Sequence, residues 1–209
     1  MTVPRPRVPT DRLADDGWAQ LEDSERTFFE SPMVTVRSRF VLYEDRRLRE
    51  RVRETTGVDQ LWRSFFASRL VFRGPLTAGL GTIIDRLVRP QATTRFVDDL
   101  RDRGFRDIDR RGSRRLRIDS DREGTAIEYT LAYPIDRADM TAQVDPDTST
   151  ASSVRGTAWL VIWAVDRDVL LSGGTYPREA IATDDDMEQP VDPTTYRTEL
   201  FELIRSVTG

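Results

Sequence analysis

The chain has 209 residues and a formal net charge of −4. All 32 of its basic residues are Arg, and it contains no Lys, His or Cys. Without these residues there can be no Walker A loop, no Schiff base, no Ser-His-Asp or Cys-His nucleophile, no disulfide and no ordinary structural zinc site. We therefore expect no cofactor and no metal, and the length suits one domain with its own core.

The absence of Lys has two explanations, a GC-rich coding bias and adaptation to concentrated salt. In concentrated salt, acidic side chains and Arg replace the strongly hydrated Lys ammonium group. The richness in Asp, Thr and Val favours salt, whereas the modest net charge keeps the coding bias open. The sequence thus predicts a halophilic protein.

The N-terminus and the hydrophobic segments point to a cytoplasmic protein with no membrane partner. Arg and Pro occupy the start, MTVPRPRVPT, where a signal peptide would need an apolar stretch. The longest apolar run, 158–165, is far shorter than the roughly 20 residues that span a bilayer.

The N-terminal half opens with an arm. Pro4, Pro6 and Pro9 make residues 1–9 an extended arm, followed by a single α+β domain over residues 10–209. Thr10 is the expected cap of a short helix that bears Leu13, Trp18 and Leu21.

The next elements alternate between strand and helix. An alternating pattern predicts a strand over 34–43, and Asp45 is the expected cap of a helix that ends at Gly57. A second alternating run predicts a strand over 64–72. Residues 75–89 are ambiguous, because their apolar spacing suits a helix that Gly79 and Gly81 resist.

Pro90 marks the start of a helix that carries Phe96, Val97 and Leu100 and ends at Gly104. The period then changes to two, which predicts consecutive short strands joined by turns. The expected strands are 105–109, 114–119, 125–133, 140–144, 154–166 and 169–176. Neighbouring strands joined by short turns pair antiparallel.

The run from Trp159 to Val165 is apolar on both faces, which is typical of a central strand covered on both sides. Trp159 and Trp163 should therefore be core residues. After an acidic loop over 182–191, Asp192 and Pro193 supply the cap and first turn of a final amphipathic helix. The expected fold is α+β, with one twisted, mainly antiparallel sheet covered by helices on both faces, an α/β/α sandwich.

The segments LVIWAVDRDVLLSGGTYPREA and TTYRTELFELIRSVTG of the C-terminal half resemble haloarchaeal proteins of the Mog1/PsbP-like sandwich group. The resemblance lies in the order of the elements, covers about a third of the chain and carries no catalytic motif. It implies an antiparallel sheet covered by helices, and a protein that binds a partner instead of turning over a substrate.

The densest basic cluster surrounds a predicted hairpin at Gly112 and Ser113. It consists of Arg110, Arg111, Arg114, Arg115 and Arg117. Guanidinium groups suit phosphate or carboxylate, so these residues are candidates for anion binding. No aromatic residues are interleaved with them and the whole chain is acidic, which disfavours nucleic acid. A solvated, Asp-paired hairpin is the alternative.

Two acidic features are further candidates. Glu128 lies mid-strand and is the best single candidate for acid–base catalysis, against the alternative of an exposed Glu opposite an Arg. The run 184–186 and Glu188 could bind a hard cation, but it lacks the spacing of a calcium loop and suits a solvated loop better.

Three functions remain open. The first is a non-enzymatic binding or interaction protein, with an unidentified protein or anionic ligand as partner. The second is an enzyme that uses carboxylate, Tyr or Arg groups, and the third is nucleic-acid or phosphate-ligand binding through the Arg-rich hairpin. An acid deep in a closed pocket would favour the enzyme, and a continuous Arg face free of acids would favour nucleic acid.

Overall fold

The computed structural model describes residues 2–74, 79–135, 153–179 and 192–209. Its strands are β1 (Trp18–Glu30), β2 (Thr35–Asp45), β3 (Ser64–Arg73), β4 (Arg106–Arg117), β5 (Glu123–Pro134), β6 (Ser153–Val165) and β7 (Asp168–Pro177). Its helices are α1 (Thr10–Asp15), α2 (Arg46–Thr56), α3 (Leu80–Ile83), a π-helical turn (Ile84–Val88), α4 (Arg89–Asp102) and α5 (Pro193–Arg205).

The strands form one seven-stranded sheet in the order β1-β2-β3-β7-β6-β5-β4, and every neighbouring pair is antiparallel. β1 to β3 form one meander and β4 to β7 form another. The two meanders join where β3 pairs with β7, which leaves β1 and β4 as the two edges. The predicted α+β class with an antiparallel sheet is confirmed.

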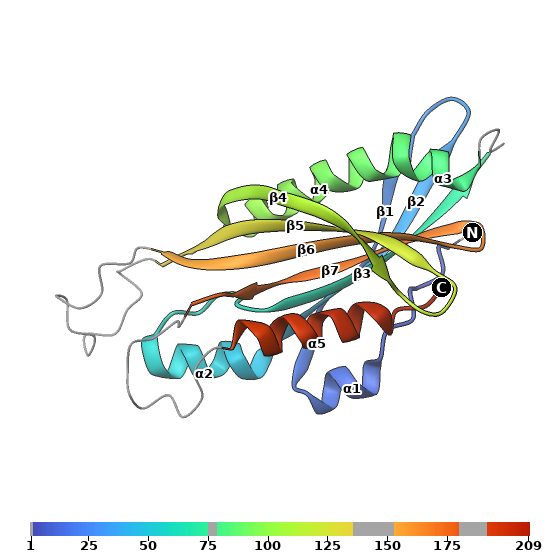
Figure 1. Ribbon diagram of the computed structural model, residues 1–209. Coiled ribbons are helices and arrows are strands. Elements are labelled where there is room, and N and C mark those ends of the chain that lie inside the picture. Colours follow the sequence, from blue (N-terminus) through green and yellow to red (C-terminus); the bar gives the residue numbers. More distant parts are fainter. Residues whose placement is uncertain (1, 75–78, 136–152, 180–191) are drawn as a thin grey trace.

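Alternate residues of the central strands enter two separate core clusters. Phe66 of β3 and Tyr129 of β5 pack with Phe96 of α4, whereas Phe65 and Trp159 belong to the cluster that contains α5. α4 and α5 lie apart, with the strands between them, in Figure 1. The period of two in each strand produces this division, because successive side chains point to opposite faces.

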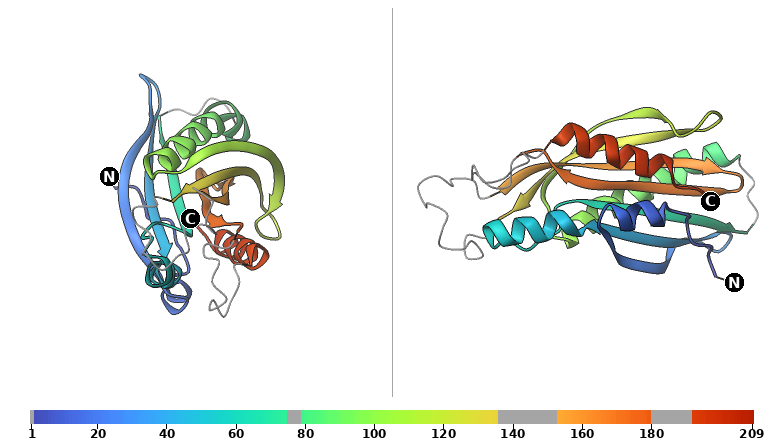
Figure 2. Two further views of the ribbon diagram at one scale, coloured as in Figure 1. Left: turned by 90° about the vertical axis from the view of Figure 1, so that its left-hand side faces the viewer. Right: turned by 90° about the horizontal axis from the view of Figure 1, so that it is seen from below.

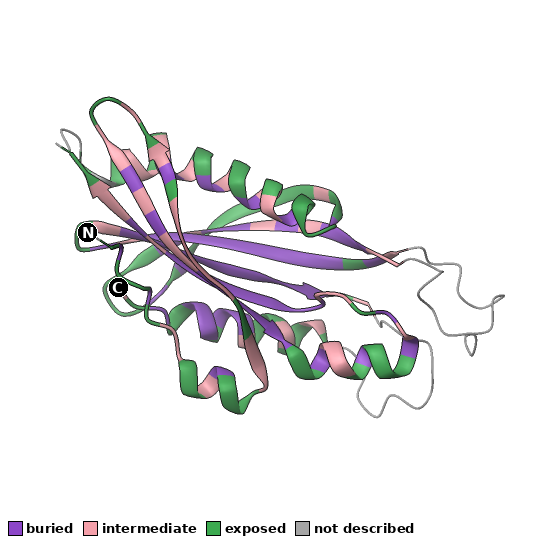
Figure 3. Ribbon diagram, turned by 180° about the vertical axis from the view of Figure 1, so that it is seen from behind, coloured by how far each residue is buried: buried purple, intermediate pink, exposed green. Residues whose placement is uncertain are grey.

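β6 is buried along almost its whole length, as Figure 3 shows for the central strands. Trp159 is 2% exposed and Trp163 is 1% exposed, which confirms that both are core residues. Gly173 of β7 pairs with Leu160 of this strand, and a Cβ atom there would lie 1.8 Å from the Trp159 carbonyl oxygen. The glycine thus permits close strand contact, and the pairing stays in register.

Asp45, Gly57 and Asp192 form the helix ends that the sequence predicts. The prediction of Thr10 as a cap is wrong, because Thr10 is the first residue of α1, and the N-cap is Pro9, which makes no side-chain capping hydrogen bond. The Asp45 carboxylate accepts a hydrogen bond from the Leu48 amide at 2.9 Å, and Gly57 ends α2 in the left-handed region with φ 82°. The Asp192 carboxylate accepts from the Thr194 amide at 2.9 Å at the start of α5.

The first predicted helix and the predicted hairpin at Gly112 differ in the structure. The first helix ends at Asp15, because Gly17 turns the chain with φ 81°, and Trp18 already begins β1. β4 is one strand that continues through Gly112 and Ser113, so no hairpin lies there.

The turn between β4 and β5 lies at residues 118–122. The Ile118 amide donates to the Arg122 carbonyl at 3.0 Å, and the Asp119 carboxylate accepts from the Asp121 and Arg122 amides. An Asp that bonds its own following backbone favours such a turn, whereas an exposed Gly on an edge strand needs none.

The ambiguous stretch is helical from Leu80 and continues through the π-helical turn into α4, so Pro90 lies inside a longer helical segment. The predicted strand 140–144 and the acidic loop 182–191 lie outside the described residues.

The arm packs along the domain in an extended course. Val3 is only 3% exposed, and the Arg7 and Thr208 backbones exchange hydrogen bonds of 2.9 and 3.0 Å. The Arg5 guanidinium also donates to the Tyr43 hydroxyl at 2.8 Å. The arm therefore contributes to the packing of the domain.

Candidate functional site

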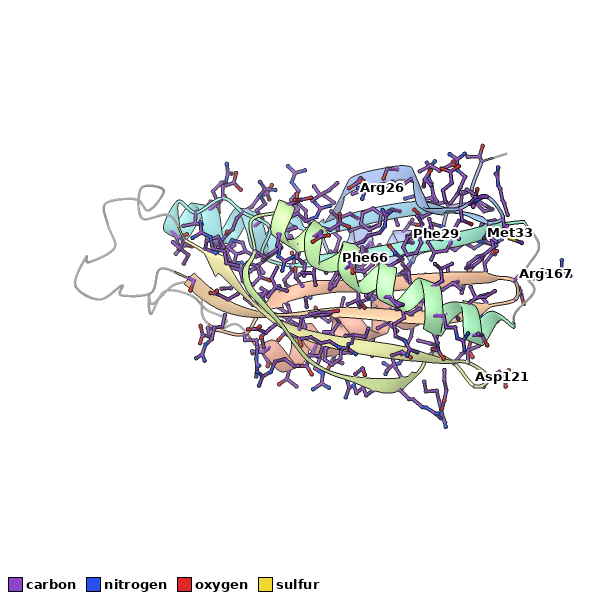
Figure 4. All side chains as sticks on the ribbon, turned by 90° about the horizontal axis from the view of Figure 1, so that it is seen from above. Arg26, Phe29, Met33, Phe66, Asp121 and Arg167 are labelled. Atoms are coloured by element: carbon purple, nitrogen blue, oxygen red, sulfur yellow. The ribbon has the colours of Figure 1, made fainter. Side chains whose placement is uncertain are left out.

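A pocket of about 460 Å³ lies between α4 and the strands that carry the α4-side core. Figure 4 views this side and shows Phe66 beside α4 and Arg26 on β1. The walls of the pocket are apolar, its floor carries hydroxyl groups and its mouth carries charged side chains. The lining residues are Arg26, Phe28, Ser38, Phe40, Leu42, Ser64, Phe66, Ser68, Gln91, Ala92, Arg95, Phe96, Asp98, Asp99, Leu100, Arg103, Phe105, Leu160, Leu171 and Thr175.

Aromatic rings form much of the wall. Phe40 and Phe66 stack with ring centroids 5.7 Å apart, and Phe66 and Phe96 lie 5.5 Å apart. Phe40 and Phe66 come from neighbouring strands, and Phe96 comes from α4 above them. A ligand in this pocket would contact aromatic and aliphatic carbon on several sides, which is typical of small-molecule sites.

The floor carries four hydroxyl groups from the α4-facing positions of β2, β3 and β7. The Ser64 and Thr175 hydroxyl oxygens are 2.9 Å apart, and the Ser38 hydroxyl donates to the Arg26 carbonyl at 3.3 Å. Ser68 is 4% exposed, and no described residue forms a hydrogen bond with its hydroxyl. Because Ser68 lines the pocket, its hydroxyl can form a hydrogen bond with a polar atom of a ligand there.

Charged residues from β1 and α4 meet at the mouth. Arg26 forms an ion pair with Glu22 on its own strand and lies 3.6 Å from the Asp99 carboxylate on α4. Arg103 lies 3.3 Å from Glu22. These pairs connect the edge strand to the helix on one side of the pocket.

The environment shifts two of these carboxyl groups in opposite directions. Burial raises the pKa of Asp99 above its usual range, although the charges of Arg26 and Arg103 partly oppose the shift. Burial would also raise the pKa of Glu22, but hydrogen bonds from Ser24 and Arg26 outweigh it and lower the pKa.

Arg95 differs from the other cations at the mouth. Its guanidinium carbon lies 5.3 Å from the centre of the Phe28 ring, and no carboxylate among the described residues forms an ion pair with it. Asp98 also lines the pocket and is the nearest acid to Arg95 along α4. Its carboxylate forms an ion pair of 3.1 Å with Arg101. Arg95 is therefore a cation available to an anionic group at the mouth.

The five arginines of the predicted cluster lie on the exposed edge strand β4 and point to different sides. Arg114 lies 4.9 Å from the Trp159 ring on the α5 side, while Arg110 and Arg115 are opposite Tyr129 and Thr125, whose strand positions face α4. Arg115 lies 3.8 Å from Glu123. Arg111 lines a second cavity, and Arg117 is an exposed residue at the end of the strand.

The acidic candidates do not meet at this pocket. Glu128 is partly buried and pairs across the strands with Gly112 and Trp159, so no Arg lies directly opposite it. The run 184–186 lies outside the described residues, and the described part of the chain holds no cluster of three or more acidic residues suited to a metal ion.

The family model of DUF6517, a domain of unknown function, matches residues 5–208. The chain belongs to the DUF6517 family. Neither a curated protein nor a solved structure matches the chain. Within the described ranges, no helix is long and apolar enough to cross a membrane.

The pocket of this DUF6517 chain lies entirely within the matched residues, and the sequence predictions missed it. Its members come from β1 to β3, α4 and the central strands, so only the tertiary structure brings them together. One local signal was present, since Ser64 and Ser68 place hydroxyl groups on the same face of a strand as Phe66. Polar positions on an otherwise apolar strand face can mark a ligand site.

Proposed function

We propose that this protein is a non-enzymatic binding protein that holds a small amphipathic ligand in the pocket under α4. The observation that carries the proposal is the combination of aromatic walls with the Ser68 hydroxyl on the floor and Arg95 at the mouth, for which the described residues provide neither a hydrogen-bond partner nor a carboxylate, respectively. An apolar body would occupy the wall region, and a carboxylate or sulfonate would face Arg95.

The position of the acids supports binding over catalysis. Among the described lining residues, the carboxylates are Asp98 and Asp99, both at the mouth and both near arginines. The Asp99 side chain is 40% exposed, so it is not an acid deep in a closed pocket. An enzyme that uses carboxylate, Tyr or Arg groups is therefore the weaker alternative.

Three broader expectations belong to the same proposal. We infer an α/β/α sandwich, with α4 on one face of the sheet and α5 on the other. The resemblance to the Mog1/PsbP-like group, whose members bind partners, agrees with a binding role, and this step is an analogy of fold. The composition without Lys supports a halophilic setting, and we expect the protein to be cytoplasmic.

A fluorescence titration with 1-anilinonaphthalene-8-sulfonate, which joins an apolar ring system to a sulfonate, tests the proposal. We expect saturable binding that Arg95→Gln weakens at least tenfold. Arg86→Gln is the matched control, because Arg86 is exposed and does not line the pocket. Equal affinity in both variants would remove Arg95 from the site.

Nuclear magnetic resonance locates the bound probe. The methyl signals of Leu100 and Leu171, which line the pocket, should shift with the probe, whereas those of Leu203 in the other core cluster should not. Shifts confined to Leu203, or no saturable binding at all, would refute the proposed function.

A further inference from the structure

A second cavity, of about 430 Å³, lies at the end of the sheet where β5 ends and β6 begins. The ends of β5, β6 and β7 lie side by side in Figure 1. Three arginines from distant parts of the sequence line the cavity, with one carboxylate among them. The described lining residues are Arg111, Thr130, Leu131, Arg155, Gly156, Arg178 and Glu179.

The single carboxylate is fully engaged by one of the three arginines. Glu179 accepts a hydrogen bond of 3.0 Å from the Arg155 amide and one of 2.5 Å from its Nε atom. These bonds and the nearby charges of Arg155 and Arg178 lower the pKa of Glu179. Glu179 thus stays ionised and neutralises Arg155, which leaves the charges of Arg111 and Arg178 in excess.

Neither Arg111 nor Arg178 forms an ion pair with a carboxylate of the described residues. The fold nevertheless holds both at the cavity. Arg111 occupies an irregularity of β4 between Arg110 and Gly112, and such bulges re-aim a side chain. The Arg178 amide donates to the Arg155 carbonyl at 2.8 Å, which fixes its backbone beside β6.

The cavity also offers a neutral donor. Thr130 lies on β5 opposite Asp109 of β4 and Thr157 of β6, and it lines the cavity between Arg111 and Arg155. Two guanidinium groups and a hydroxyl provide several donors to one group of oxygen atoms, which is the requirement of a phosphate.

We propose that this cavity binds the phosphate group of a small molecule through Arg111 and Arg178, with the Thr130 hydroxyl as a third donor. The site lies outside the pocket under α4 and shares no lining residue with it. Of its three arginines, Arg111 belongs to the basic cluster described in the sequence analysis. Arg155 lies on β6, and Arg178 directly follows β7.

Calorimetric titration of the full chain with inorganic phosphate and with glycerol 3-phosphate tests this site. We expect saturable binding of at least one of them at low chloride concentration. The double variant Arg111→Gln/Arg178→Gln should lower the affinity at least tenfold, and Thr130→Val should lower it less. Arg115→Gln, an exposed position of the same strand outside the cavity, is the matched control.

Binding of inorganic phosphate alone would assign the site to the free ion, and binding of the ester would extend it to phosphorylated metabolites. Absence of saturable binding for both, or an equal loss in Arg115→Gln, would overturn the proposal. The Arg111 and Arg178 side chains are exposed, so their variants should keep the melting temperature of the parent chain.

Discussion

Arg26 of β1 and Asp99 of α4 form an ion pair across the mouth of the pocket, with 3.6 Å between the guanidinium nitrogen and the carboxylate oxygen. Each side chain is 40% exposed, so the pair contributes at most about 1 kcal/mol. The contact therefore orients the edge strand and the helix at little energetic cost. It can also open at little cost, which would admit a ligand without disturbing the core.

The raised pKa of Asp99 predicts a pH-dependent difference between the parent chain and Asp99→Asn. A carboxyl group with a raised pKa binds its proton more readily in the folded state, so stability is gained as the pH falls through that pKa. The parent chain should gain stability relative to Asp99→Asn between pH 7 and pH 4, as measured by urea unfolding.

Glu22→Gln supplies the control of opposite sign. The pKa of Glu22 is lowered, so its contribution is present at neutral pH and is lost as the pH falls through the folded pKa. The parent chain should therefore lose stability relative to Glu22→Gln on acidification. The same trend in both variants would contradict the assigned directions.

Trp163→Ala should lower the free energy of unfolding by about 3–5 kcal/mol, the usual cost of removing a large aromatic residue from a core. Trp163 is 1% exposed on the central strand β6. Met33→Ala is the control, since Met33, labelled in Figure 4, is 69% exposed. This substitution should change the free energy of unfolding by about 0.5 kcal/mol or less. A loss below about 1 kcal/mol for Trp163→Ala would refute its core role.

Tyr133→Phe should cost about 1–3 kcal/mol, because it leaves a buried carbonyl without a partner. The Tyr133 hydroxyl donates to the Trp62 carbonyl at 2.6 Å, and the two rings lie 5.3 Å apart. Tyr133→Leu removes the ring contact as well and should cost more. Chemical denaturation measures both, and a Tyr133→Phe protein as stable as the parent would show that the hydrogen bond contributes nothing.

Removal of residues 1–9 should leave a cooperatively folded domain of lower stability. The truncation exposes the surface that Val3 covers, and burial of one such side chain is worth about 1.5–3 kcal/mol. It also removes the backbone pairing of Arg7 with Thr208. Urea unfolding should show a lower midpoint with a single transition, whereas an unchanged midpoint would mean that the arm only rests on the surface.

The melting temperature should rise from low to multimolar KCl if the composition reflects adaptation to salt. Excess acidic charge repels itself in dilute buffer, and salt relieves the repulsion. Salt also screens surface ion pairs such as Arg46–Glu50, which acts in the opposite direction. Thermal melts across the KCl range decide between the two effects, and a melting temperature that falls would count against the halophilic interpretation.

Local patterns predicted much of the secondary structure. Asp45 and Gly57 mark the ends of α2, and alternation marks β3 and β6, because caps and side-chain periods are local properties. The edge strand β1 was not predicted. Its α4-facing positions include Glu22 and Arg26, so the strand lacks the alternation of apolar and polar residues.

The pocket could not be predicted in the same way. Phe40, Phe66 and Phe96 each fit an ordinary core pattern, and their convergence depends on the course of α4 across the sheet. The left view of Figure 2 shows this helix between the β1–β3 and β4–β5 parts of the curved sheet. The sequence pattern of a single segment does not reveal how far α4 lies from the sheet or at which angle it crosses the strands.

The pairing of β3 with β7 also constrains synthesis on the ribosome. β1 to β3 are synthesised about a hundred residues before β7. Leu70 of β3 therefore has no pairing partner until Val169 of β7 has been made. During that interval β3 offers an open strand edge with Phe65 and Phe66 beside it, a typical template for unwanted association. The order of the strands therefore makes β7 the segment whose arrival closes the sheet and ends the vulnerable period of the nascent chain.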